Sequence, residues 1–176
     1  MKLKGADSGK ARKGIVFAIA GAVVILTAAL VALYTMDMFA SRARRAEVAA
    51  RGAQVMPFDL DQTMHVFQKL EDGGLQRVVV KDPSNKEQIV LIQTHLKEES
   101  ERFRKGDFSD PAKIHGEDMP GLAELKAGAG QIDVRYAPLP DGAEIRYTTK
   151  DPKTAMVLHR WFDAQLSDHG HHASGH

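Results

Sequence analysis

Apolar residues form one uninterrupted run near the start of the chain, from Ile15 to Tyr34. The run contains no charged side chain, and Thr27 is its only polar residue before Tyr34. A hydrocarbon core about 30 Å thick needs about 20 apolar residues in a helix that rises about 1.5 Å per residue. The run has this length, so we expect a transmembrane helix over residues 15–36.

The flanks of this run predict its orientation. Residues 1–14 carry five Lys or Arg against one acidic residue, and cytoplasmic flanks are enriched in these cations. We therefore expect an unstructured cytoplasmic basic stub and a periplasmic head in a single-pass protein of the inner (plasma) membrane. Arg42, Arg44 and Arg45 flank the other end and weaken this asymmetry. A cleaved signal peptide is the alternative, but the run exceeds the about 7 to 15 apolar residues typical of one.

A stalk and a linker are predicted over residues 37–62. Residues 37–51 are rich in Ala and Arg, which favour helix, and Gly52 is a typical helix stop. We expect the membrane helix to continue through this stalk to Gly52. The following residues, which include Pro57, read as the linker.

The head, residues 63–168, alternates apolar and polar positions in a way that predicts two β-hairpins. Each pair of strands flanks a turn signal that contains Asp and Gly. The first strands and turn are residues 63–70, Asp72-Gly73-Gly74 and residues 75–81; the second are residues 132–136, Pro140-Asp141-Gly142 and residues 143–148.

Each hairpin is followed by Lys-Asp-Pro and an amphipathic helix. Asp is favoured at the N-cap and Pro at the first helical position, so we expect helices to open at Asp82-Pro83 and Asp151-Pro152. Their apolar stripes are Ile89, Ile92, Leu96 and Phe103 in the first, and Val157, Leu158, Trp161, Phe162 and Leu166 in the second. This ββα repeat predicts an α+β fold: a four-stranded antiparallel sheet with both helices on one face.

Residues 105–130 between the repeats are too long for an idle connection in a compact domain. We expect one short helix there, from Pro120 to Ala127, ended by Gly128. Ordered loops on rigid scaffolds often carry function, so this connection is a candidate binding region.

Composition excludes several classes of site and partner. The chain has no cysteine, which excludes disulfides, thiolate metal sites and redox pairs. Residues 53–176 carry a net charge of −5 and lack basic stripes, so we expect no nucleic-acid partner. The lipid bilayer is the predicted partner, with a membrane protein as a candidate second one. Serines lack a nucleophile-elbow setting and no glycine-rich phosphate loop is present, so the sequence favours a non-catalytic role.

Three stretches of the head resemble a family of small bacterial exported or membrane-anchored domains. They are FRKGDFSDPAKIHGEDMPGLAEL, PDGAEIRYTTKDP and LHRWFDAQLSDHG, and the similarity covers about Leu75 to His169. Members of this family sometimes carry the label aspartate carbamoyltransferase. The Ser-Thr-Arg-Thr phosphate motif of carbamoyltransferases is absent here, so the resemblance implies a folded domain and no particular activity.

Histidines provide the candidate chemistry. His169, His171, His172 and His176 crowd the tail, residues 169–176, a composition that binds copper or zinc; the alternative is an unstructured end whose metal affinity is incidental. His115 and Met119 place nitrogen and sulfur four residues apart, which suits Cu(I), with His95 or the tail as the source of a third ligand. The alternative for this pair is that Met119 packs under the loop and His115 bonds to the backbone.

Two functions remain open from the sequence. The first is a membrane-anchored extracytoplasmic accessory domain that handles a transition metal, copper or zinc, through these histidines. The second is a non-catalytic structural or assembly subunit of a larger membrane complex.

Overall fold

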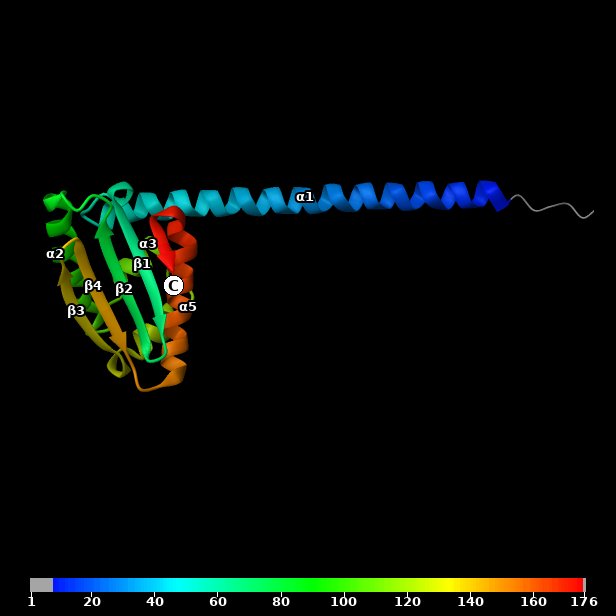
Figure 1. Cartoon of the computed structure of the whole chain (residues 1–176). Helices are drawn as coiled ribbons and strands as arrows, with labels where there is room; N and C mark the ends of the chain where they lie inside the picture. The colour runs from blue at the N-terminus through cyan, green and yellow to red at the C-terminus, as the bar shows by residue number, and fades with distance from the viewer. Residues whose placement is uncertain (1–7, 176) are drawn as a thin grey trace, which may run out of the picture. The chain divides into compact units, whose positions relative to one another are not determined.

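The computed structural model describes residues 8–175, with the side chains of residues 21–23 and 25–175. The chain divides into two units, one before and one after the junction of Ala43 and Arg44. We refer to residues from Arg44 onward as the second unit. Figure 1 shows its sheet and helices.

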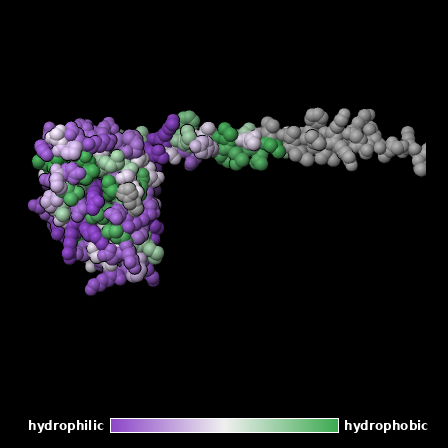
Figure 2. All heavy atoms as spheres, in the orientation of Figure 1, coloured by the Kyte–Doolittle hydropathy of each residue, from purple (hydrophilic) through white to green (hydrophobic). Residues whose placement is uncertain are grey.

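Helix α1, Ser8–Val55, contains the apolar run. Within the described residues it is the one helix, from Gly21 onward, whose length and hydropathy suit a membrane crossing. The described apolar side chains of residues 21–34 are exposed, for example Ile25 at 72% and Leu33 at 63%, and Figure 2 shows a hydrophobic band on this helix. Such exposure of contiguous apolar surface indicates burial in lipid or against a partner. The helix is compatible with a single-pass membrane protein.

The ends of α1 differ from the sequence expectation. The helix already begins at Ser8, inside the stub that was predicted to be unstructured; residues 1–7 lie outside the described part. It also continues past Gly52 to Val55. Gly52 is buried, and a Cβ there would lie 2.7 Å from the Met56 side chain. Close packing therefore accounts for this glycine better than helix termination does.

The second unit contains a five-stranded mixed sheet in the order β3-β4-β2-β1-β5, where a four-stranded antiparallel sheet was predicted. The strands are β1 Thr63–Leu70, β2 Gly73–Val80, β3 Asp133–Leu139, β4 Gly142–Thr148 and β5 Ala173–Gly175. The two predicted hairpins are present as antiparallel pairs β1–β2 and β3–β4. Strand β5 pairs in parallel with His65–Phe67 of β1. Its sequence, Ala-Ser-Gly, has no alternation that could have predicted it.

Helices α2, Lys86–Phe103, and α5, Pro152–His169, cover the same face of the sheet. Tyr147 on β4 contacts Phe103 of α2 and both Trp161 and Phe162 of α5, with ring centroids 5.8 to 6.3 Å apart. The core lies between this face and the two helices. Trp161 is 1% exposed there, as its place on the apolar stripe predicts.

The start of α5 matches the predicted cap and the start of α2 does not. The Asp151 carboxylate accepts from the backbone N–H groups of Lys153 and Thr154, with Pro152 in the first turn. In α2 the N-cap is Asn85, which accepts from the Gln88 N–H. Asp82 instead accepts from the Ser84 N–H and hydroxyl, which forms a turn before the helix.

The long connection folds into two short helices. The predicted one is α4, Leu122–Ala127, ended by Gly128, and α3, Ser109–His115, precedes it. Three single turns of 3-10 helix complete the unit: η1 Leu60–Gln62, η2 Ala129–Gln131 and η3 Gly170–His172. Gly170 adopts φ of 55°, in the left-handed region, where it turns the chain from α5 into η3. The predicted tail is thus ordered as η3 and β5 through Gly175.

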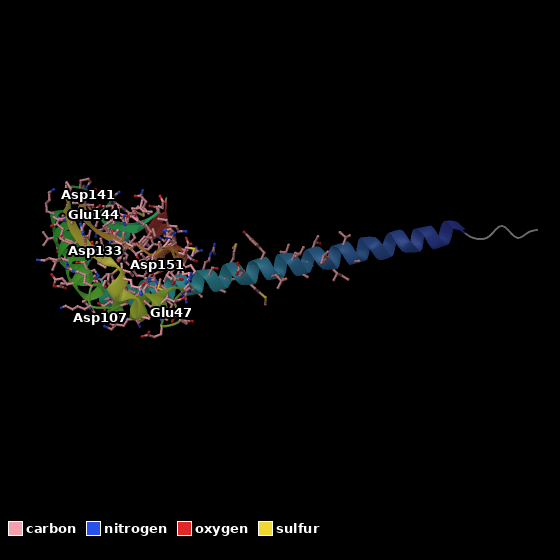
Figure 3. All side chains as sticks on the ribbon, turned by 90° about the horizontal axis from the view of Figure 1, so that it is seen from below. Glu47, Asp107, Asp133, Asp141, Glu144 and Asp151 are labelled. Carbon is pink, nitrogen blue, oxygen red and sulfur yellow. The ribbon has the colours of Figure 1, made fainter. Side chains whose placement is uncertain are left out.

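The exterior of the second unit is mainly polar and carries many carboxylates. Figure 2 shows a mostly hydrophilic surface, and Figure 3 labels outward-pointing acidic side chains from several elements. Glu47, Asp133 and Asp107 are 66%, 52% and 45% exposed. Each of these three carboxylates forms an ion pair with an arginine.

Candidate functional site

A cavity with a mixed polar and apolar lining lies in the second unit, between the sheet and helices α2, α3 and α5. Its volume is about 40 Å³, enough for about three water-sized atoms. We call it the histidine chamber, because four imidazoles line it. Its polar lining consists of His65, Gln76, His95, Glu99, Asp110, His115, Gln165 and His169, and its apolar lining includes Met56, Phe58, Phe103 and Trp161.

Four different elements supply the chamber histidines. His65 and Phe67 both lie on the buried face of β1. The ring of His169, at the end of α5, stacks on the His65 ring with the centroids 4.7 Å apart. His115 at the end of α3 meets His169 edge-on at 5.0 Å. His95 on α2 lies edge-on against Phe58 at 5.7 Å. The chamber therefore exists only in the folded domain.

Burial keeps three of these imidazoles neutral. It lowers the pKa of His65 to about 3, and the neighbouring histidines lower it further. Burial also lowers the pKa of His169 well below its ordinary value, and that of His95 in the same direction. Neutral imidazole is the form that ligates metals, accepts protons and accepts hydrogen bonds.

His115 belongs to a hydrogen-bond network with the buried Asp168 and with Arg44, whose side chain is 46% exposed. Its Nδ1 lies 2.9 Å from Asp168 Oδ2, and Arg44 Nη2 donates to the same oxygen at 2.8 Å and to the His115 carbonyl at 3.1 Å. Burial raises the pKa of Asp168, but the hydrogen bonds from His115 and Arg44 outweigh it and leave that pKa below its ordinary value. An ionised Asp168 favours the tautomer of neutral His115 that carries its proton on Nδ1, and in that tautomer Nε2 holds the lone pair.

The opposite wall of the chamber carries a second group of charges. Arg102 donates to Glu99 at 3.1 Å and also to Asp110, which accepts from Lys113 at 2.8 Å. Burial and the nearby Asp110 raise the pKa of Glu99 to about 8. Glu99 is thus a protonated carboxyl group at neutral pH.

Three buried polar atoms of the chamber have no hydrogen-bond partner among the described residues. They are His65 Nδ1, Trp161 Nε1 and Gln165 Nε2. The three side chains are 3%, 1% and 5% exposed. Buried polar groups are nearly always paired, so unpaired ones around one cavity indicate that something polar occupies it.

A second cluster lies at the surface, where η1 meets η3. Asp61, His171 and His172 place one ligand atom each within 4.8 Å of one another, and no other such group occurs among residues with described side chains. His172 Nε2 lies 3.6 Å from Asp61 Oδ1. The His172 side chain is 12% exposed and that of Asp61 is 86% exposed. We call these three residues the surface cluster.

The predicted site residues fall into these two places, with two exceptions. His95, His115 and His169 line the chamber, and His171 and His172 belong to the surface cluster. Met119 is buried at 3% exposure but lies outside the chamber lining. His176 lies outside the described residues.

Sequence reasoning missed four important groups: His65, Glu99, Asp168 and Asp61. His65 carried a usable signal, because it alternates with Phe67 and so had to face the core. Asp168 and Asp61 carried none, because their partners lie 53 and more than 100 positions away along the chain.

Comparison of the chain with protein-family models, with curated proteins and with solved structures finds no match.

Proposed function

We propose that this protein is a membrane-anchored accessory protein that binds a divalent transition metal at the surface cluster. The observation that carries the proposal is the approach of one carboxylate and two imidazoles to within 4.8 Å. Two imidazole nitrogens and one carboxylate oxygen suit Zn(II), Cu(II) or Ni(II). Mg(II) prefers oxygen ligands, so this set suits it less well.

The geometry favours exchangeable binding. Three protein ligands leave a fourth position open in a tetrahedral site, so the metal can be passed on. Asp61 and His171 are exposed, which gives the ion a direct path from solvent.

Divalent metal titration of the full chain in mild detergent tests the proposal. Asp61→Asn and the double variant His171→Gln/His172→Gln remove ligands, and each should weaken Zn(II) or Cu(II) binding by about tenfold or more. Asp163→Asn is the matched control, because its carboxylate is 58% exposed and pairs with Lys69 away from the cluster. Equal affinity in all variants, with fixed proteins co-purifying, would favour the structural-subunit role instead.

The proposed orientation places the N-terminus in the cytoplasm and the second unit in the periplasm. Its support is the basic stub before the apolar run. The chain has no cysteine, so single introduced thiols report position cleanly. A membrane-impermeant maleimide should label Lys150→Cys in intact spheroplasts and Lys4→Cys only after permeabilisation; the reverse pattern would invert the topology.

A further inference from the structure

We propose that the histidine chamber is a second metal site, specific for Cu(I), in which the Met56 thioether completes a set of imidazole ligands. This site is separate from the surface cluster and does not depend on it. The sequence had paired His115 with the thioether of Met119; the fold instead brings Met56, at 7% exposure, to the cavity that His115 lines.

The donor set is the first argument. The chamber joins histidines from four elements with one thioether, and His65 Nδ1 is a buried lone-pair candidate without a partner among the described residues. Thioether sulfur selects Cu(I) among the biological metals, and imidazole binds copper well. A metal ion bound in this cavity would supply a partner for the buried His65 nitrogen.

The small number of converging nitrogen and oxygen donors is the second argument. Within the part of the chain whose side chains are described, no three His, Asp or Glu ligand atoms of the chamber lie within 4.8 Å of one another. Tetrahedral Zn(II) sites need three or four such ligands. Cu(I) has a filled d shell and accepts two or three ligands, so two imidazoles with a thioether satisfy it.

The surroundings of the donors are the third argument. His115 holds its Nδ1 proton against Asp168, the outer-shell arrangement typical of metal-binding histidines. Phe58, Phe103 and Trp161 shield the cavity from water, which disfavours the strongly hydrated Cu(II) ion.

A single isosteric change tests this site. Met56→Leu removes the sulfur with little change in volume, and buried Leu-for-Met exchanges are well tolerated. Under anaerobic, reducing conditions, competition with a chromophoric Cu(I) chelator should show affinity at least tenfold lower for this variant of the full chain. Met119→Leu is the matched control: it makes the same change at a buried methionine outside the chamber and should bind like the native chain.

Two further measurements decide the outcome. X-ray absorption of the Cu(I) complex should show a sulfur neighbour that is lost in Met56→Leu and kept in Met119→Leu. His95→Gln changes a partly exposed chamber histidine and provides a second variant if Met56→Leu folds poorly; it should also weaken Cu(I) binding at least tenfold. Native-like Cu(I) affinity in Met56→Leu and His95→Gln would overturn the proposal and leave a water-filled cavity.

The surface cluster and the chamber can be told apart in the same assay. His171→Gln/His172→Gln should lose divalent binding and retain Cu(I) binding, while Met56→Leu should do the opposite. Failure of either proposal therefore leaves the other intact.

Discussion

The two histidine clusters of this protein are built in opposite ways. The chamber collects His65, His95, His115 and His169 from four packed elements, and its geometry is fixed by the core around it. The surface cluster depends on His171 and His172, which lie on a short terminal segment, and on the exposed Asp61. Histidine content alone does not distinguish these cases; burial and the elements that carry the rings do.

The difference has energetic consequences. Chamber residues contribute to folding, because their removal leaves cavities or unpaired buried groups. Surface-cluster residues are solvated on one side, so their substitution should affect ligand binding and leave folding nearly unchanged. Each prediction below tests that division, from the largest expected effect to the smallest.

Trp161→Ala should have the largest effect. The indole is 1% exposed and packs edge-on against Phe103, Phe108 and Tyr147. Loss of such a buried aromatic costs about 3 to 5 kcal/mol, so urea unfolding followed by circular dichroism should show a much earlier midpoint. Met156→Ala, on the exposed side of the same helix, should change stability by less than about 0.5 kcal/mol. Equal losses of stability in the two variants would mean that Trp161, which lines the chamber, is not part of the core.

Asp168→Asn should destabilise the second unit by about 2 kcal/mol. It removes the charged acceptor that His115 and Arg44 share, while the side-chain volume stays the same. The carboxylate is 5% exposed, so water cannot replace it fully. Asp163→Asn breaks an exposed pair with Lys69 and should cost much less. Thermal unfolding of both variants gives the comparison. A loss of stability in Asp168→Asn as small as that in Asp163→Asn would mean that the network does not stabilise the fold.

Acid should destabilise the chamber specifically. The pKa of His65 is about 3 in the folded state and about 6.5 for an unperturbed imidazole in the unfolded chain, so the unfolded chain binds one more proton between these values. The stability contributed by this residue is therefore fully present above pH 6.5 and falls by about 1.4 kcal/mol per pH unit below it. Burial also lowers the pKa values of His95, His169 and His172, which therefore add to the trend. The free energy of unfolding should be measured from pH 7 to 4 for the native chain and for His65→Gln. Its slope against pH should be smaller in the variant by the equivalent of about one proton. An unchanged slope would mean that the His65 ring is accessible to solvent.

His171→Gln/His172→Gln should have the smallest effect on folding. His171 is exposed, and the His172 side chain, although only 12% exposed, lies outside the hydrophobic core, so stability without metal should change by less than about 1 kcal/mol. Added Zn(II) should raise the unfolding temperature of the native chain and not of this variant, because only the native chain gains binding energy. Metal-free destabilisation comparable to that of Asp168→Asn would place these histidines among the structural contacts.

Strong local patterns predicted most of the fold. The apolar run marked α1, alternation with Asp-Gly turns marked both hairpins, and Asp151-Pro152 marked the start of α5. Each of these signals is contained within about 20 neighbouring residues. Strand β5 and helix α3 lack such a signal, because packing against distant segments stabilises them and their own sequences carry no period.

The candidate sites were predicted less well than the fold. The histidines were recognised by type, but their grouping depended on which elements meet in space. His115 and Met119 are four residues apart along the chain, yet the methionine that lines the chamber with His115 is Met56, 59 positions away and assigned to a linker. Sequence spacing can identify two metal ligands that lie within one helix or loop. It cannot identify the donors of this chamber, because they lie on separate elements.

Strand β5 has a consequence for how the protein can be handled and how it can associate. It covers the backbone of His65–Phe67 at one margin of the sheet. Uncovered strand margins recruit other strands, either from a partner or from identical molecules that aggregate. A chain truncated after Gly170 would expose this margin together with the rings of His65 and His169. We therefore expect this truncation to change the self-association of the protein as well as its metal binding, because it also removes His171 and His172.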